Sequence, residues 1–179
     1  WFVTMRPYSA LALSFPFLVY GAYAGVKRLR EIRNALVSFA FSLFVFLGIL
    51  LLFNTLTNGH PLVFGFDVLW GEKVRPGFGN SAWGPGHTPL RGLFQTFSNL
   101  SGVNKYLFEW PVPSLLFVAF VFMSHTRNRW DYLLLAGFGS IVLAYFFYWF
   151  QDWCFGPRFY YESACLLILL TARGMQTLP

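Results

Sequence analysis

The sequence has 179 residues, of which 56% are hydrophobic and only 11% are charged. Soluble domains carry about 25% charged residues, so this composition offers too little polar surface for a soluble protein and favours a lipid environment. The net charge of +6 does not indicate nucleic-acid binding. Its basic residues cluster beside apolar runs and form no stripe with interleaved stacking aromatic residues.

The chain begins at Trp1 with a short apolar stretch, and a basic cluster follows the first long apolar run. A secretory signal peptide has the opposite order, with a basic region before its apolar segment. We therefore expect a fragment of a longer polytopic membrane protein, taken from its C-terminal part.

The first two predicted membrane helices cover residues 8–24 and 34–54. Both have about the 17–25 apolar residues that a helix needs to cross a bilayer. Pro16 is expected to kink the first helix. Between them, the segment KRLREIR carries four basic residues in seven positions. It is predicted to form a cytoplasmic loop, because short basic loops stay on that side of the membrane.

Residues 55–110 contain no apolar run long enough to cross a membrane and are predicted to form one long outer loop. Within this loop, Leu90, Leu93, Phe94 and Phe97 recur at helical spacing. This spacing predicts an amphipathic helix that lies along the membrane surface.

Three further membrane helices are predicted over residues 111–124, 132–150 and 158–172. The predicted fold class is therefore an all-α integral membrane protein with about five transmembrane helices, forming a single domain over residues 1–179. Five crossings place the short basic loops on one side. The loops 55–110 and 151–163 are then predicted to be periplasmic, in a protein of the bacterial inner membrane.

The stretch QDWCFGPRFYYES follows the predicted helix 132–150, runs into the start of the predicted helix 158–172, and combines charged with aromatic residues. Gly156-Pro157 predicts a turn or a helix start, and Glu162 follows Arg158 by four residues, so the two side chains can pair on one helix face. One interpretation is an ion pair anchored at the membrane interface. In the other, the Arg158 guanidinium binds a phosphate group, and tyrosines such as Tyr161 flank a lipid or a sugar.

His87 and Arg91 in the long loop are separated by one helical turn. This spacing allows a joint contact with a phosphate, and the alternative is an ordinary histidine in a solvated loop. The histidines are scattered along the chain, so no metal site is expected.

Acidic residues of the long loop are candidates for activating an acceptor hydroxyl group, as glycosyl transfer requires. They are Asp67, Glu72 and Glu109. No arrangement in the sequence singles out one of them, so the catalytic residue is unknown.

Several stretches together resemble bacterial membrane glycosyltransferases of the GT-C class, relatives of the dolichyl-phosphate-mannose protein mannosyltransferases. The stretches are TMRPYSALALSFPFLVYG, NTLTNGHPL, GHTPLRGL, NKYLFEWP and FGPRFYYE. In that family an LTRP stretch opens one helix, and a later helix ends in an Asn, Thr-Gly, Pro-Leu pattern. The matching residues here are Arg6, Pro7, Asn54, Gly59, Pro61 and Leu62, and Asn58 interrupts the Thr-Gly step.

The resemblance implies a helical membrane enzyme that passes a sugar from a polyprenyl-phosphate donor to a lipid, glycan or protein at the outer face. No cofactor is expected, and membrane lipid is the other expected partner. The family's catalytic acid lies in an early outer loop, which we expect to be missing from this chain. The residues expected to bind substrate are Arg158, Glu162, Tyr161, His87 and Arg91.

Two alternatives to a glycosyltransferase are a transporter or flippase and a non-catalytic membrane subunit. Transporters often carry polar residues at mid-membrane and internal repeats. The predicted helix 34–54 and the middle of 132–150 carry no such charges, and no repeat is visible. The glycosyltransferase hypothesis predicts instead that the segments 55–110 and 151–163 converge on one polar cavity.

Overall fold

A computed structural model describes most of the chain, and the described part is helical throughout, with no strand. The described residues are 6–71, 73, 75–151 and 156–177, with the backbone alone for 26–32. The chain divides into two compact units, Trp1–Arg75 and Pro76–Pro179.

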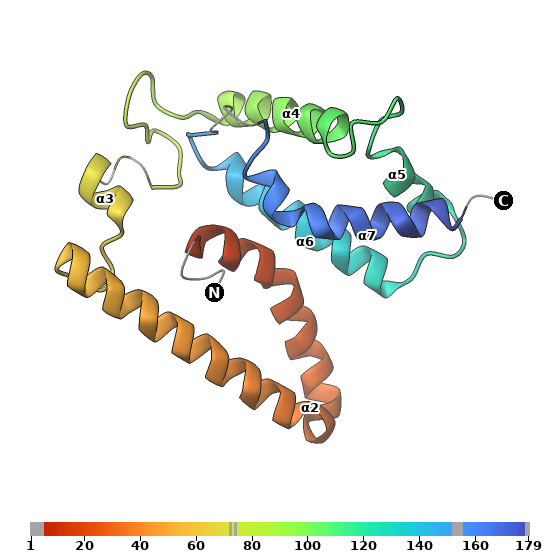
Figure 1. Ribbon diagram of the computed structural model, residues 1–179, viewed down its shortest axis with the longest axis horizontal. Helices are drawn as coiled ribbons and strands as arrows, with labels where there is room; N and C mark the ends of the chain where they lie inside the picture. Colours follow the sequence, from red (N-terminus) through yellow and green to blue (C-terminus); the bar gives the residue numbers. More distant parts are fainter. Residues whose placement is uncertain (1–5, 72, 74, 152–155, 178–179) are drawn as a thin grey trace. The chain divides into compact units, whose positions relative to one another are not determined.

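The first unit contains one long helix, α2 (Pro7–Asn58), and one short helix, α3 (Gly65–Trp70) (Figure 1). The backbone of α2 stays helical through residues 25–33, where the sequence predicted a cytoplasmic loop. The backbone of the two predicted membrane helices is therefore helical without a break and also contains Pro16, but α2 bends sharply near its middle into two arms (Figure 1). The side chains of Lys27, Arg28 and Arg30, within the basic cluster, lie outside the described residues.

The turn that ends α2 is held by a left-handed glycine and by two side-chain hydrogen bonds. Gly59 adopts the left-handed conformation, with φ of 78°, which glycine reaches without a steric cost. The buried Asn54 amide donates to the Pro61 carbonyl at 3.0 Å, and the Asn58 amide donates to the Val63 carbonyl at 2.7 Å. The NTLTNGHPL motif therefore has a local structural role in this turn.

Asp67 organises the short helix α3. Its carboxylate accepts the Phe64 N–H at 3.3 Å and pairs with the Arg75 guanidinium at 3.2 Å. The bond to the N–H stabilises the first turn of the helix, and the ion pair connects the helix to the chain that follows it.

The second unit is a helical bundle in which α7 packs against α5 and α6, and α4 packs against α6 (Figure 1). Its elements are α4 (Pro89–Tyr106), α5 (Leu116–Met123), α6 (Arg129–Phe146), the 3₁₀ turn η2 (Tyr160–Ser163) and α7 (Ala164–Met175). Its apolar core includes Val118, Val121, Ile141, Leu167 and Leu170, all of them buried.

The start of α6 is fixed by a reciprocal cap and an ion pair. The Asn128 side chain accepts the Asp131 N–H at 3.2 Å, and the Asp131 carboxylate accepts the Asn128 N–H at 2.8 Å. Arg173 near the end of α7 pairs with the buried Asp131 carboxylate at 3.3 Å. These contacts fix the N-terminus of α6 against the C-terminus of α7.

The C-terminal end of α6 is closed by polar groups from the segment around α4. His87 Nε2 donates to the Phe146 carbonyl at 2.9 Å, and the Gln95 amide donates to the Trp149 carbonyl at 3.1 Å. A carbonyl only accepts, so Nε2 of His87 carries the proton. The last carbonyls of a helix have no partner inside it, and groups from elsewhere must satisfy them where water is excluded.

A buried amide pair completes this closure. The Asn99 amide donates to Gln151 Oε1 at 2.6 Å. The Gln151 amide in turn donates to the carbonyls of Tyr148 and Tyr145, at 2.8 Å and 3.2 Å. Asn99 and Gln151 are both buried, so each amide provides the hydrogen bond that the other lacks from water.

These bonds orient α4 with its polar and small residues inward and its large apolar residues outward within the unit. The inward residues are Gly92, Asn99, Gly102 and Val103. The outward residues Leu90, Leu93, Phe94 and Phe97 have exposed fractions from 47% to 77%. The prediction of an amphipathic helix in this segment is confirmed.

The predicted number of membrane spans is wrong. Within the described residues, one stretch, Arg33–Asn58, is long and apolar enough to cross a membrane by length and composition, with a mean hydropathy of 2.8. Two of the other predicted spans, 111–124 and 158–172, are shorter in the structure than predicted because turns interrupt them. α5 has 8 residues and α7 has 12. At about 1.5 Å per residue they fall well short of a hydrocarbon core of about 30 Å.

The predicted sides of the loops depended on the count of five crossings. With a single candidate stretch, that alternation of sides no longer follows. The periplasmic location of 55–110 and 151–163 therefore stays a prediction. The first segment contains α3 and α4, and residues 152–155 of the second lie outside the described residues.

Gly174→Ala is expected to lower the free energy of unfolding by about 1–3 kcal/mol or more. A Cβ at this position of α7 would overlap the backbone carbonyl of Phe117 in α5, which has little freedom to move. Gly139→Ala in α6 is the matched control, since a Cβ there meets nothing within 4 Å and alanine favours helix. Thermal unfolding of both variants in one detergent tests this packing, which equal melting temperatures would contradict.

Candidate functional site

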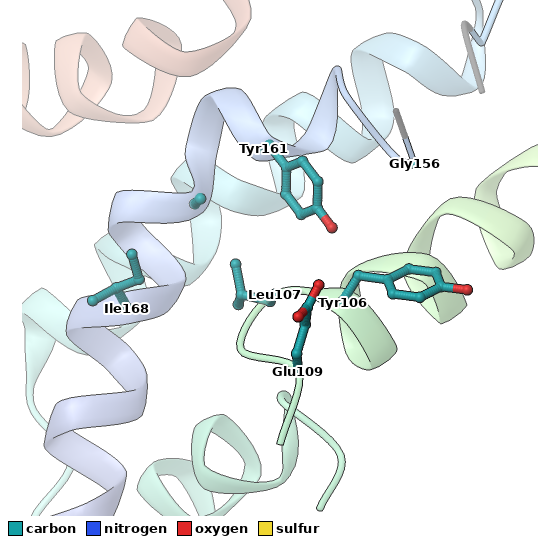
Figure 2. A pocket seen from close by; sticks show the side chains of 7 residues that line it. Tyr106, Leu107, Glu109, Gly156, Tyr161 and Ile168 are labelled. Carbon is teal, nitrogen blue, oxygen red and sulfur yellow. The ribbon is translucent and has the colours of Figure 1, made fainter. Parts of the chain in front are cut away.

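A cavity of about 690 Å³ lies in the second unit, between the end of α4 and the start of α7 (Figure 2). This volume falls within the range of about 300–1,000 Å³ that is usual for small-molecule sites. The residues that line it are Tyr106, Leu107, Glu109, Gly156, Tyr161, Ala164 and Ile168. It combines two phenols and one carboxylate with apolar side chains, and we call it the Glu109 pocket.

Glu109 occupies its place in the pocket through an unusual backbone conformation. Its φ is 53°, in the left-handed region that residues other than glycine rarely adopt. The rings of its neighbours Phe108 and Trp110 stack on each other, with centroids 4.5 Å apart, and Trp110 also contacts Phe117 edge-on at 5.9 Å. We attribute the left-handed turn at Glu109 to this stacking of the residues on either side.

Asn104 attaches the Glu109 loop to the end of α4. Its backbone carbonyl accepts the Ser114 N–H at 2.8 Å, and its side-chain oxygen accepts the Leu115 N–H at 3.0 Å. The far end of the loop is therefore held to α4 by one residue of the helix. A conformation with positive φ costs about 1–3 kcal/mol and persists only where the surrounding structure supports it.

Tyr161 reaches the pocket from the turn at Gly156-Pro157. Gly156 has a φ of 73°, and the N–H groups of Tyr160 and Tyr161 both donate to the Pro157 carbonyl, at 2.9 Å and 3.2 Å. The predicted turn is confirmed. The next α-helix begins at Ala164, after η2, rather than near 158 as predicted.

The pocket keeps the Tyr161 phenol protonated. Burial raises the pKa of Tyr161 above its ordinary value of 10.0, and the nearby Glu109 carboxylate and Tyr106 raise it further. In Figure 2 the Tyr161 hydroxyl and the Glu109 carboxylate point toward the same space, whereas the Tyr106 hydroxyl points away. The pocket thus offers a hydrogen-bond donor next to an acceptor.

Of the predicted substrate-binding residues, Tyr161 lines the pocket. Arg158 is exposed in the turn, where its N–H donates to the Gly156 carbonyl, and Glu162 lies in η2. Neither of these two lines the pocket. The sequence analysis predicted that Arg158 and Glu162 share one face of an α-helix. Arg158 instead precedes η2, so the four-residue spacing does not place the two side chains on such a face.

His87 and Arg91 also lie away from the pocket lining and have structural contacts of their own. His87 is 1% exposed, stacks on Phe78 and bonds to Phe146, so it is not a histidine in a solvated loop. The Arg91 guanidinium donates to the Pro85 carbonyl at 2.9 Å. Both residues support the loop that leads into α4.

Glu109 is the functional candidate that the sequence did not single out. Two features that sequence spacing does not encode identify Glu109 as a candidate. They are the backbone turn between stacked rings and the approach of Tyr161 from a distant segment. The available signal was an isolated acid between aromatic residues in FEWPVP. Residues of both predicted loops line the pocket, in agreement with the prediction that 55–110 and 151–163 converge.

The chain matches no family model, and the comparisons with curated proteins and with solved structures found no match. The resemblance to membrane glycosyltransferases therefore stays a prediction. In the part of the chain that the structure describes, no group of three or more His, Cys, Asp or Glu side chains is placed to hold a metal ion.

Glu109→Gln is expected to lower the pKa of Tyr161 toward 10.0, because it removes the carboxylate while burial remains. The folded chain holds this proton more tightly than the unfolded chain does. The resulting stabilisation is fully present below pH of about 10 and is lost as the pH rises through the raised pKa. In the variant, the loss begins at the same pH, which the unfolded chain sets, but it ends at a lower pH and is smaller in total.

Carbon-13 NMR of ring-labelled tyrosine, with Tyr161→Phe to assign the signal, measures this titration. Asp67→Asn removes a carboxylate in the other unit and is the control. An unchanged Tyr161 titration in Glu109→Gln would contradict the proximity of the two groups.

Proposed function

We propose that this chain acts in glycosyl transfer at a membrane, with a polyprenyl-phosphate sugar as donor and the Glu109 pocket as the site of the acceptor hydroxyl group. The observation that carries the proposal is the arrangement of Glu109 and Tyr161. A carboxylate and a protonated phenol face one solvent-accessible cavity beside apolar walls. Such a combination suits a ligand with hydroxyl groups on an apolar ring.

In the proposed reaction, Glu109 of this chain, in place of the acid that the resemblance puts in an early outer loop, accepts a hydrogen bond from the acceptor hydroxyl and takes its proton. The acceptor oxygen forms a bond to the anomeric carbon of the sugar while the bond from that carbon to the donor phosphate oxygen breaks. The polyprenyl phosphate leaves with the electron pair. A carboxylate in this role typically contributes about 10²–10⁴-fold to the rate.

The backbone at Glu109 supports a functional role. A left-handed conformation at a residue other than glycine is often retained at functional sites, where the position of one side chain matters more than local stability. The stretch Arg33–Asn58 supports membrane attachment, because its length and hydropathy suit a bilayer. The bacterial inner membrane is the proposed location.

Glu109→Gln is expected to reduce sugar transfer by at least about 10²-fold, because glutamine keeps the shape of the side chain but cannot take the proton. Membranes containing the chain are incubated with radiolabelled polyprenyl-phosphate mannose or glucose, and label in lipid, glycan and protein is counted. Tyr132→Phe, on an exposed side chain of α6 away from the pocket, is expected to leave transfer unchanged.

Thermal unfolding of Glu109→Gln separates a catalytic loss from a folding defect. The proposal predicts an unfolding transition like that of the unsubstituted chain together with lost transfer. Transfer that is absent from the unsubstituted chain, or equal in Glu109→Gln, would contradict it.

A further inference from the structure

Among the described residues that line the Glu109 pocket, one carries a negative charge and none carries a positive charge. Glu109 provides a carboxylate, and Tyr161 provides a neutral donor. None of the described lining residues is a lysine, arginine or histidine. A phosphate group brought into this cavity would meet the carboxylate at short range, and like charges repel.

Two nearby cations stand outside the lining. The Lys105 ammonium lies 5.0 Å from the centroid of the Tyr106 ring, as a cation–π contact on the neighbouring side chain. Arg158 lies two residues after Gly156 and is exposed. Neither side chain lines the pocket, so neither offers a phosphate group inside it a direct partner.

The remaining walls suit the apolar faces of a ring. Leu107 contributes from the end of α4 and Ile168 from α7 (Figure 2). Ala164, one helical turn before Ile168 in α7, also lines the pocket. Carbohydrate rings present C–H groups on their faces and hydroxyl groups at their edges. Such a ring can place its face on the α7 wall and its hydroxyls between Glu109 and Tyr161.

We propose that the Glu109 pocket selects uncharged, hydroxyl-bearing rings and excludes phosphorylated or acidic ones. The inference rests on the proposed function, because it defines the acceptor of that reaction as a neutral sugar. The phosphate of the donor is then held elsewhere, outside this pocket. Glu109 accepts hydrogen bonds from ring hydroxyls, and Tyr161 donates one to a ring oxygen.

Three ligands that share one ring test this selectivity without any transfer reaction. They are methyl glucoside, glucuronate and glucose-6-phosphate, which differ in charge at a single position. Binding to the full chain in detergent micelles is measured by isothermal titration calorimetry and by saturation-transfer NMR. The neutral glycoside is expected to bind about tenfold or more tightly than either anion, because of repulsion by Glu109.

Two substitutions separate charge from shape. Glu109→Gln is expected to reduce the difference in affinity between the neutral glycoside and the two anions. It should improve the affinity for both anions by about tenfold and lower the affinity for the neutral glycoside. Tyr161→Phe removes the donor and is expected to weaken the neutral glycoside by about fivefold to tenfold. Tyr132→Phe, on an exposed side chain of α6 away from the pocket, is the matched control and should leave all three affinities unchanged.

The outcomes distinguish this inference from the proposed function. Selective binding of the neutral ring without sugar transfer would retain the inference and contradict the glycosyl-transfer proposal. Sugar transfer together with anions bound as tightly as the neutral ring would retain the glycosyl-transfer proposal and contradict the inference. Absence of binding of methyl glucoside at millimolar concentration, or unchanged selectivity in Glu109→Gln, would overturn the inference.

Discussion

The closure of the C-terminal end of α6 is the constraint on which the second unit depends. The carbonyl groups of Phe146 and Trp149 lie among aromatic side chains and accept hydrogen bonds from His87 and Gln95 of the segment around α4. Those of Tyr145 and Tyr148 accept from Gln151, which Asn99 of α4 binds in turn. An unsatisfied buried carbonyl costs about 1–3 kcal/mol, so several together would outweigh a large part of a domain's net stability. This requirement explains why α4 turns its amides inward and leaves its large apolar residues outside.

The position of the Glu109 pocket follows from that closure. Because α4 is bonded along its polar face to the end of α6, its own C-terminus comes to lie beside the turn that connects α6 to α7. The Glu109 loop leaves α4 at this point, and Tyr161 enters from the turn. The close approach of α7 and α5 at Gly174 holds the opposite end of α7. The pocket is therefore built on helices whose relative positions are fixed by buried hydrogen bonds and backbone packing.

The local features that the sequence predicted correctly are those with short-range causes. Helical periodicity placed α4, and the Gly156-Pro157 turn follows from the backbone preferences of those two residues. The predicted number of membrane spans was wrong because it depended on where the helices end. Apolar runs were counted through turn residues, and the basic run at 25–33 was interpreted as a loop although the backbone there is helical. Composition records which residues avoid water, but it does not record where a helix ends.

By itself, the sequence determined an apolar, helical protein, the amphipathic character of α4 and the presence of Tyr161 in an aromatic turn. Only the tertiary structure decided that His87 is a buried helix cap, that Arg158 lies outside the cavity and that Glu109 faces Tyr161. The physical reason is distance along the chain. Glu109 and Tyr161 are 52 residues apart, and their approach is set by hydrogen bonds between α4 and the end of α6, which no local pattern specifies.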